Sequence, residues 1–553
     1  MNDEVGTNQN RLVHANEHRL AKRSSATLVK RGLELINPKK ERIIQFSDDC
    51  QLGLLYIRDA GDFHIYSPEW ESLGGTQGEK VIPAGKDVRL SIWGTEWNQG
   101  FLPQLANLGS SDLQFIDCQI VRDSGLAYLK DLIGLRGLDL TSSKVSNSEL
   151  RYLNGMQELV LLFLANTEIG DDGLKFINHM LDLRSLNLAG TRISGTGFIH
   201  LRNLRDLKIL DLTSCQGLVD DQLFHIGQLI GLKSLHLLNT SVSDSGLAHL
   251  IRLGNLHTLD IAFTKVTDWG LRYLSELSTI RYVHLSGTNI TDSGLTFLSG
   301  LKNLELLGLL SMKINGSGLR FLLNSSSLRS LSLSSDQIDG KKLEPLKSFV
   351  ELTELSLGGY GITNQIPQFI KNLKKLEKLN LGGTSIDDGG LCFLSDMTNL
   401  KSLNLSHTHI TDDGLSYLSH MINLETLDLG RTKITGAGLF HLQGLKKLKG
   451  LNLRESEITD EGLKALRHLT ALESLNLEDT QIIDAGVEYL LDLPTLKNLF
   501  LKGSRVTGEK CFELKNQLKD VRILFNTAES DPDSKNLLEE DWWWWLHDPN
   551  ETE

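Results

Sequence analysis

Leucine recurs at fixed intervals along most of the chain. Compared with itself, the sequence repeats every 24 residues, so that LKSLNLSHTHITDDGLSYLSHMIN (400–423) is followed by LETLDLGRTKITGAGLFHLQGLKK (424–447). The shared pattern is L-x-x-L-x-L-x-x-T-x-I-T-D-x-G-L-x-x-L-x-x-L-x-x, and its residues are numbered here as repeat positions 1 to 24. A fixed period of this length indicates a repeat array. Full copies begin at Leu135, Leu159, Leu183, Leu207, Leu232, Leu256, Ile280, Leu304, Leu328, Leu352, Leu376, Leu400, Leu424, Leu448, Leu472 and Leu496.

Each copy predicts one short strand and one short helix. Leucines at positions 4 and 6 alternate with polar residues, as on a strand with one buried face, whereas positions 16, 19 and 22 have helical spacing. No copy could bury its apolar face alone, so the copies are expected to stack. At roughly 4.8 Å per strand, some seventeen repeats predict an inner parallel sheet on the order of 80 Å long. The predicted fold class is an α/β solenoid with short helices outside.

The turn between strand and helix has its own pattern. Position 12 is Ser, Thr, Asp or Asn in most copies, and such residues accept hydrogen bonds from the first free amides of a helix. An aspartate often follows at position 13, where negative charge favours a helix N-terminus. Glycine stands at position 15 in eleven of the sixteen full copies. We expect close backbone packing at that position.

This pattern resembles the leucine-rich repeat family, in its subclass with a T-D-x-G-L turn, over roughly residues 111–525. The resemblance implies a curved solenoid that acts as a non-enzymatic scaffold and binds a partner protein through its concave face. Similar repeats occur in F-box substrate receptors of ubiquitin ligases and in bacterial GALA-type effectors. A substrate-recognition adaptor of that kind is therefore the alternative function. The segment 1–44 is short, basic and poor in apolar residues, which argues against an F-box there.

Three further segments flank the repeats. Residues 1–44 carry nine Lys/Arg against five Asp/Glu and are predicted to be a disordered or partly helical arm, with a nuclear-import or anionic-surface tag as the alternative. Residues 45–110 contain short alternating stretches separated by Asp-Ala-Gly and Pro-Ala-Gly, which predict a β-rich N-terminal cap ending in a strand at 88–92. Such a cap would cover the first apolar edge of the array.

The tail, residues 526–553, has nine acidic residues against a single lysine and a run of four tryptophans. The acidity indicates disorder, but tryptophan suits both buried caps and interface anchors. Two readings remain open: a cap on the last strand, or a docking peptide for another protein. The tail residues expected to dock are Trp542, Trp543, Trp544 and Trp545.

The bulk composition excludes several classes of function. Lys and Arg number 57 against 70 Asp and Glu, a formal charge of −13, so binding of nucleic acid through the net field is not expected. The five cysteines are far apart and fit neither a disulfide framework nor a zinc site. Neither a signal peptide nor an uninterrupted apolar run of 18 residues is present. These features predict a cytoplasmic protein, with a nuclear location as the alternative, and no membrane insertion; they leave its oligomeric state open.

The variable positions of the inner sheet are expected to carry function, because the template positions are committed to packing. Position 2 of the later repeats alternates in sign, which predicts a self-satisfied charge ladder: Glu377, Lys401, Glu425, Lys449, Glu473 and Lys497. Earlier repeats carry mostly cations there, which repel one another and have no partner in their own column. This predicts an acidic partner surface. The cations are Arg184, Lys208, Lys233, His257, Arg281 and, after Glu305, Arg329.

Apolar side chains stand beside these cations. Phe263, Tyr282, Leu306 and Leu310 are unusual choices for a polar display surface, and an apolar cluster rimmed by charge is typical of a protein-binding hot spot. Repeats 232–327 are therefore predicted to form the main contact face. The alternative is that these residues pack against each other or a neighbouring loop. Tyr360 replaces the usual threonine at position 9 and is a second candidate contact.

No cofactor, metal site or catalytic residue is predicted. His407, His409 and Asp412 lie close together in sequence, but the aspartate is a repeated turn residue and the pattern places no third metal ligand beside the two histidines. Position 5 aligns His236, Asp260 and His284, but Gly308 follows and no nucleophile lies within reach. The sequence also lacks phosphate-loop, metalloprotease, nucleophile-elbow and kinase motifs.

Overall fold

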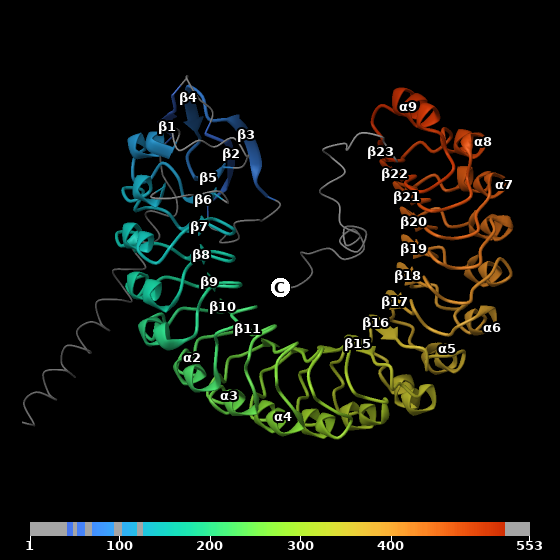
Figure 1. Cartoon of the computed structure of the whole chain (residues 1–553), viewed down its shortest axis with the longest axis horizontal. Helices are drawn as coiled ribbons and strands as arrows, with labels where there is room; N and C mark the ends of the chain where they lie inside the picture. Colours follow the sequence, from blue (N-terminus) through green and yellow to red (C-terminus); the bar gives the residue numbers. More distant parts are fainter. Residues whose placement is uncertain (1–40, 48–51, 61–68, 93–101, 119–124, 526–553) are drawn as a thin grey trace, which may run out of the picture. The chain divides into compact units, whose positions relative to one another are not determined.

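The computed structural model describes residues 41–47, 52–60, 69–92, 102–118 and 125–525. The chain divides into two compact units, an N-terminal unit (residues 1–241) and a C-terminal unit (residues 242–553). In both, parallel strands form one layer and short helices form the other (Figure 1). We call the sheet face that carries positions 3 and 5 the inner face, and the helical side the outer face.

The N-terminal unit begins with strands that differ from the repeats. β1 (Arg42–Gln45) pairs antiparallel with β4 (Glu79–Ile82). β2 (Leu54–Asp59) pairs antiparallel with both β3 (Glu71–Gly75) and β5 (Lys86–Ile92). β5 then pairs in parallel with β6 (Phe115–Cys118), the first strand of the repeat sheet. Strand structure thus begins before residue 45 and includes the strand expected at 88–92, whereas the domain boundaries themselves stay predictions.

The repeat strands of the N-terminal unit continue this sheet in parallel. They are β7 (Gly137–Asp139), β8 (Leu161–Phe163), β9 (Ser185–Asn187), β10 (Ile209–Asp211) and β11 (Ser234–His236). The extra residue of the Leu207 copy follows β10, and Leu210 still pairs with Leu235. The outer elements are the 3-10 helices η1 (Leu102–Asn107), η2 (Gly125–Tyr128), η3 (Glu149–Leu153), η4 (Asp171–Phe176), η5 (Thr196–Leu201) and η6 (Asp220–Gln222), with α2 (Leu223–Ile226).

The C-terminal unit repeats the same arrangement. Its parallel strands are β12 (Thr258–Asp260), β13 (Tyr282–His284), β14 (Leu306–Leu309), β15 (Ser330–Ser334), β16 (Glu354–Gly358), β17 (Lys378–Asn380), β18 (Ser402–Asn404), β19 (Thr426–Asp428), β20 (Gly450–Asn452), β21 (Ser474–Asn476), β22 (Asn498–Phe500) and β23 (Arg522–Leu524). Neighbouring strands pair at equal repeat positions, as Leu403 does with Leu427.

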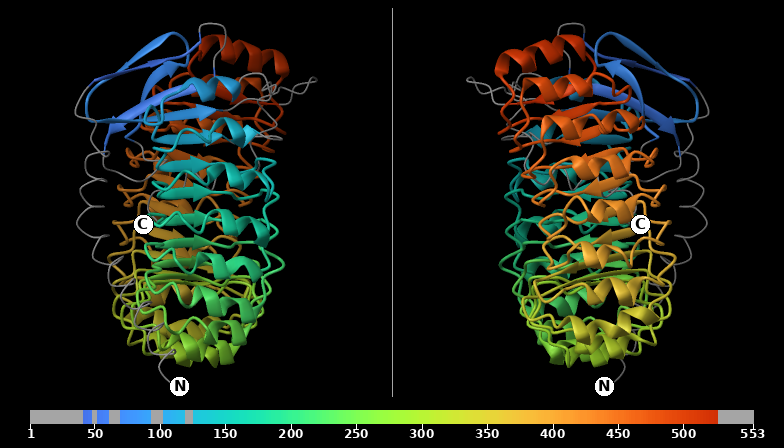
Figure 2. Two further views of the ribbon diagram at one scale, coloured as in Figure 1. Left: turned by 90° about the vertical axis from the view of Figure 1, so that its left-hand side faces the viewer. Right: turned by 90° about the vertical axis from the view of Figure 1, so that its right-hand side faces the viewer.

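The outer elements of the C-terminal unit are short, as predicted, and many are 3-10 helices. In each repeat about six residues lie between the turn that follows the strand and the connection to the next strand, which is too few for a long α-helix. They are α3 (Asp244–Ala248), α4 (Asp268–Leu274), η7 (Gly294–Leu298), η8 (Ser317–Leu322), η9 (Gly340–Ser348), α5 (Gln365–Ile370), α6 (Asp388–Leu391), η10 (Gly414–Leu418), η11 (Ala437–Leu442), α7 (Asp460–Leu463), η12 (Leu466–His468), α8 (Asp484–Val487), η13 (Glu488–Leu490) and α9 (Gly508–Gln517). Figure 2 shows them stacked on the outer face.

The leucine template forms the core between the two layers. In the Leu400 copy the strand leucines Leu403 and Leu405, the turn residue Ile410 and the helix residues Leu415 and Leu418 are all buried. Position 9 completes this core with a polar side chain. Thr408 is buried, and its hydroxyl donates to the carbonyl of Leu405 at 2.5 Å, so this buried donor has a partner.

The turn aspartate connects successive repeats. The amide and hydroxyl of Thr411 both donate to the carboxylate of Asp388 in the preceding repeat, at 2.9 and 2.6 Å. The same pair of bonds joins Thr291 to Asp268. The prediction that position 12 caps its own helix is therefore correct in part: Thr267 accepts from the Trp269 amide, but a main partner of this position is the neighbouring aspartate.

Glycine at position 15 makes room for that aspartate. A Cβ on Gly414 would lie 2.2 Å from an oxygen of Asp388, and a Cβ on Gly294 would lie 2.3 Å from Asp268. The expected close packing is thus between a glycine and the carboxylate one repeat earlier. Where the aspartate is absent, a larger residue can stand at position 15. Ile366 occupies position 15 where the preceding repeat has Gly340 instead of aspartate.

Candidate partner-binding surface

Position 8, which follows the strand, has a left-handed backbone in most repeats. Asn166, Asn239 and Gly383 adopt it at little cost. Phe263 adopts it too, with a φ of 53°, which is an outlier for a bulky side chain and costs on the order of 1 kcal/mol. Its side chain is 56% exposed, so burial does not compensate for this cost. Polar residues with the same φ, such as Arg431, have partners: Arg431 pairs with Glu455 at 2.8 Å.

The ring of Phe263 lies over the neighbouring repeat. A Cβ on Gly287 would be 2.5 Å from the ring, so the absence of a side chain there creates the space that the ring fills. The Gly287 amide donates to the Leu310 carbonyl of the following repeat at 2.8 Å. Leu310 is 39% exposed. Three successive repeats therefore place Phe263, Gly287 and Leu310 next to one another at the edge of the inner face.

Two further apolar side chains extend this region along the strands. Tyr282 and Leu306 stand opposite each other in register on β13 and β14, and both are half-buried. Leu307 and Leu309 point into the core, so the alternate residues Leu306 and Leu310 lie on the inner side. We call Phe263, Tyr282, Leu306 and Leu310 together the inner apolar surface. Part of it is packed internally, as the alternative reading predicted, while Phe263 and Leu310 are exposed.

The sheet beside the inner apolar surface has a floor of small side chains. In regular repeats a position 5 side chain, such as Asn404, accepts from the position 7 amide at 2.8 Å, which closes a turn after three strand residues. Gly308, Ser332 and Ser356 replace it on β14, β15 and β16, which run for four, five and five residues. Sequence reasoning missed this floor, although the interruption of the Asn/Asp column at position 5 was the available signal.

One cation of the predicted basic run has a partner in its own column. Two guanidinium nitrogens of Arg281 donate to one oxygen of Glu305, at 2.6 and 2.9 Å, and the Tyr282 hydroxyl donates to the other at 3.2 Å. The hydrogen bond to Glu305 raises the pKa of Arg281, and burial together with Glu305 raises that of Tyr282. The prediction of an unpartnered basic run was therefore wrong for Arg281, because Glu305 at the same position of the next strand neutralises it.

Other cations lie close to the inner apolar surface in sequence or act on it electrostatically. Lys265 and Lys313 follow Phe263 and Leu310 by two and three residues, and the charge of Arg329 acts on Tyr282. Lys265 and Lys313, both at position 10, and Arg329 at position 2 are exposed. Within the part of the chain that the structure describes, none of the three forms an ion pair; Lys313 donates to the Asn289 side chain at 3.3 Å. The two lysines were not singled out from the sequence. We call Lys265, Lys313 and Arg329 the rim cations.

The remaining predicted cations belong to the N-terminal unit. Arg184 and Lys233 are exposed and Lys208 is half-buried, with its ammonium nitrogen beside Gly231. Arg136, at the same repeat position, is buried instead and pairs with Asp87 at 3.2 Å. Because this trio and the inner apolar surface lie in different units, their combination into a single patch stays a prediction.

Tyr360 is 73% exposed and follows Gly359, which has a φ of 121°. At position 9 other copies place a buried hydroxyl that donates to the carbonyl of position 6, so the tyrosine ring departs from the structural role of its column. Its own carbonyl accepts from the Ser385 hydroxyl at 2.9 Å. The structure thus presents Tyr360 as a surface side chain, and its role in binding remains a prediction.

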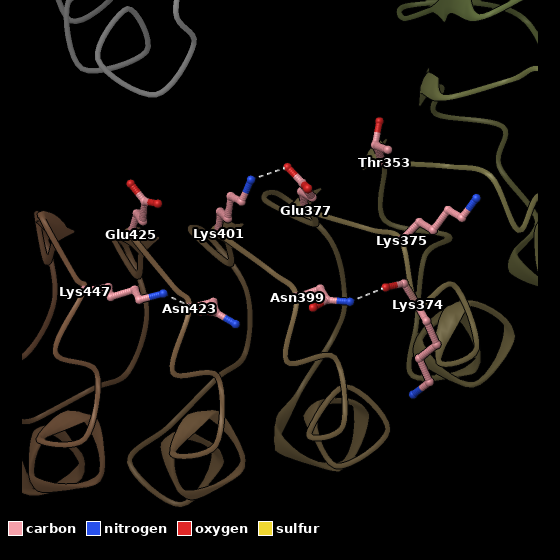
Figure 3. Close-up of a pocket in the computed structure, with 9 residues that line it drawn as sticks. All are labelled: Thr353, Lys374, Lys375, Glu377, Asn399, Lys401, Asn423, Glu425 and Lys447. Atoms are coloured by element: carbon pink, nitrogen blue, oxygen red, sulfur yellow. Dashed lines mark hydrogen bonds and ion pairs between the residues drawn. The ribbon is translucent and has the colours of Figure 1, made fainter.

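In the later repeats the charged side chains at position 2 pair with one another. Lys401, Lys449 and Lys497 pair with the glutamate of the preceding repeat at 2.7, 2.7 and 2.8 Å, which confirms the predicted ladder. A shallow hollow of about 490 Å³ runs along this edge (Figure 3). There the Asn399 amide donates to the Lys374 carbonyl, and Lys447 donates to Asn423. The hollow is lined by Thr353, Lys374, Lys375, Glu377, Asn399, Lys401, Asn423, Glu425 and Lys447.

The histidine-rich turn has structural contacts. His407 is a left-handed position 8 residue, and Asp412 accepts from the Thr435 hydroxyl of the next repeat. Across the described ranges, no three His, Cys, Asp or Glu side chains gather as metal ligands would. In the position 5 row, Asp260 accepts from the amide of Ala262. Trp542 to Trp545 lie outside the described residues.

Models of leucine-rich repeats match residues 422–482 and, separately, residues 276–299 and 396–419. Among solved structures, a leucine-rich repeat protein of Leptospira interrogans is 21% identical over 73% of this chain and 99% of its own, with a TM-score of 0.49. An internalin of Listeria monocytogenes is 20% identical over 64% and 82%, with a TM-score of 0.35. A plant peptide hormone receptor, RGFR1, solved in complex with RGF2, is 16% identical over 80% and 87%, with a TM-score of 0.31.

A search of the curated proteins finds no match. No helix in the described part of the chain is long and apolar enough to cross a membrane. The matched repeat models fall on copies of the 24-residue pattern, and each matched copy contributes one strand to the parallel sheet and one short outer helix. The chain is a leucine-rich repeat protein.

Proposed function

We propose that the protein is a non-enzymatic scaffold that binds a partner protein through the inner face of its repeat sheet, chiefly through the inner apolar surface. The observation that carries this proposal is the strained, exposed Phe263 over Gly287. Folding does not require a phenylalanine there, since Asn166 and Asn239 adopt the same backbone conformation. A cost that folding does not explain is accounted for by binding.

The chemistry of the surface supports a protein partner. Phe263 and Leu310 are exposed apolar side chains in a polar setting, which is typical of an interface anchor. Burying one such side chain completely contributes roughly 1.5–3 kcal/mol. The small, half-buried side chains of Ser332 and Ser356 would allow the partner to approach the sheet closely. The rim cations favour a partner with acidic side chains.

The test compares capture of partners by the intact protein and by the double variant Phe263→Asn, Leu310→Ser. Both substitutions introduce residue types that sister repeats carry at the same positions, as in Asn239 and Ser286, so the fold should persist. Phe440→Ser is the matched control, because Phe440 is 50% exposed on the outer helix η11. After thermal melts have shown that all three baits are folded at the temperature of the assay, we expect the double variant to lose proteins that the other two baits retain. Equal capture by all three baits would overturn the proposal.

The alternative function, a substrate-recognition adaptor of a ubiquitin ligase, uses the inner face in the same way. The same experiment distinguishes it. Components of the ligase would bind elsewhere on the chain, so all three baits would capture them, and substrates alone would depend on the inner apolar surface. Charge reversal of Arg184, Lys208 and Lys233 tests the predicted basic trio separately, and unchanged capture would remove that trio from the site.

A further inference from the structure

We infer that the inner apolar surface is also a docking site for the chain's own tail, residues 526–553. The tail lies outside the described residues, and the inference is drawn from its sequence and from the surface that would receive it. It rests on the proposed function, because the tail and the partner protein would share one surface. In this arrangement the tail is a tethered ligand that a partner must displace.

The composition of the tail complements this surface in both apolar character and charge. The tail contains Trp542 to Trp545, preceded by Glu539, Glu540 and Asp541, and carries nine acidic residues against Lys535. Indole side chains contribute large apolar contact areas, and the receiving surface offers exposed Phe263 and Leu310. The rim cations Lys265, Lys313 and Arg329 form no ion pair in the described part of the chain, although the Glu351 carboxylate interacts with Arg329 at longer range.

The sheet floor also favours large side chains at this place. On β14 to β16, position 5 holds Gly308, Ser332 and Ser356, whereas from Asn380 to Asn476 this column holds asparagine or aspartate. Gly308 is buried, and a Cβ on it would already be 3.1 Å from the His284 ring, so the accessible part of the floor is at the half-buried Ser332 and Ser356. Bulky indoles would fill the space that the small side chains leave.

The tail is long enough to reach the surface. β23 ends at Leu524, and 16 residues, 526–541, separate Phe525 from Trp542. At roughly 3.3–3.6 Å per residue, this segment spans up to about 60 Å. The path from β23 to β14 crosses nine strand spacings of roughly 4.8 Å, about 43 Å along the sheet. The tryptophans can therefore lie over the inner apolar surface without strain in the connecting segment.

The tether makes even a weak contact effective. A short flexible connection gives an effective concentration on the order of 1 mM. An intrinsic dissociation constant of about 0.1 mM would then keep the tail docked in about nine molecules of ten. A free tail peptide would bind poorly at ordinary concentrations, so the full chain is the appropriate sample.

The experiment is fluorine NMR on the full chain labelled with 5-fluorotryptophan. The four tail signals are assigned by their loss in a variant with Trp542–Trp545 replaced by phenylalanine, and a free peptide of residues 526–553 provides the undocked positions. We expect the wild-type tail signals to be broadened and shifted from those of the peptide. Phe263→Asn with Leu310→Ser should return them to the peptide positions, and charge reversal of the rim cations should move them in the same direction.

The controls separate this arrangement from others. Phe512→Ser alters the end of the C-terminal unit, where Phe512 is 58% exposed and packs against Phe525 at 5.4 Å. Tail signals that respond to Phe512→Ser and not to the inner double variant would overturn the inference in favour of an edge cap. Signals equal to those of the free peptide, or shifts that grow with protein concentration, would also overturn it. Each of these results leaves the partner-capture test of the proposed function unaffected.

Discussion

Two regions of the C-terminal unit have the same backbone plan and different inner faces. In repeats 376–496, glutamate and lysine pair across strands, and from Asn380 to Asn476 the position 5 side chains hold the turn that ends the strand. In repeats 256–352, the position 5 column is interrupted, three strands are longer, and Phe263 and Leu310 are exposed. In the first region the polar groups pair with one another, whereas the second region exposes apolar side chains and cations.

The difference lies in columns that the fold does not fix. Both regions keep the buried leucines, and both use the aspartate that connects one repeat to the next, as at Asp268 and Asp388. Position 5 contributes to turn geometry but is replaceable, as Ser332 shows. The proposed binding surface thus lies where a few neighbouring strands lack the repeated structural side chains of position 5.

The largest predicted loss of stability comes from the contact between aspartate and glycine of successive repeats, which both regions share. Gly414→Ala would place a Cβ 2.2 Å from the Asp388 carboxylate and would disturb the two bonds from Thr411. We expect a loss of roughly 2–4 kcal/mol in the free energy of unfolding, from overpacking together with a displaced charged acceptor. Urea denaturation followed by circular dichroism measures this loss.

A glycine without neighbours provides the control for Gly414. Nothing lies within 4 Å of a Cβ placed on Gly300, so Gly300→Ala should change stability little. Combining Gly414→Ala with Asp388→Gly should recover part of the loss, because Gly340 and Ile366 already show that arrangement. Equal losses for Gly414→Ala and Gly300→Ala would refute the steric explanation.

This connection also shows how far the sequence carried the fold. The period, the strand and helix positions and the solenoid followed from leucine spacing, because each buried position recurs with its neighbours. The sequence analysis did not predict that the aspartate at position 13 packs against the glycine at position 15 of the next repeat. Its two partners, such as Asp388 and Gly414, lie in different copies, and reasoning within one copy assigned the aspartate to its own helix.

The second prediction concerns the exposed anchor and separates stability from binding. Phe263→Asn should raise the free energy of unfolding by about 0.5–1 kcal/mol, because asparagine tolerates a left-handed backbone better than phenylalanine. The same substitution should weaken partner binding at least about tenfold, which corresponds to 1.4 kcal/mol. Chemical denaturation and a binding titration measure the two effects. A variant that loses stability would show that Phe263 is a packing residue.

The third prediction concerns the buried carboxylate of Asp428, which is replaced by the asparagine that neighbouring repeats carry at this position. Burial raises the pKa of Asp428, although the Gly430 amide and the Asn452 side chain act in the opposite direction. The folded state therefore binds a proton more readily than the unfolded state, so the free energy of unfolding falls as pH rises from about 3.8 through the raised pKa. Asp428→Asn, which matches Asn404 and Asn452, should lack this fall and be more stable than the wild type at neutral pH. A stability difference that does not vary with pH would contradict this origin.

The candidate site was predicted in part, for physical reasons. Apolar side chains in a polar column identified Phe263 and Leu310 from the sequence, and both are exposed. The sequence analysis wrongly assigned Arg281 to the surface that binds a partner. It compared the cations of position 2 with one another and did not consider that Glu305 lies between two of them and pairs with Arg281. Lys265 and Lys313 were missed because position 10 follows the strand, and its proximity to the inner apolar surface depends on how the chain turns there.

The smallest predicted effect is in the charge ladder of the regular region. Lys449 pairs with Glu425 at 2.7 Å, but the two side chains are 54% and 37% exposed, so solvent screens much of the attraction. We expect Lys449→Ala to cost about 0.2–0.5 kcal/mol at low salt and less at high salt. Arg281→Ala is the matched substitution in the irregular region, where two nitrogens contact Glu305 and the carboxylate is 21% exposed. It should cost more than Lys449→Ala and depend less on salt, because a less exposed, two-point pair is screened less. Equal losses of stability with equal salt dependence for the two variants would mean that Glu305 is as available to solvent as Glu425. The ion pairs of the two regions would then differ only in how many there are and not in their strength.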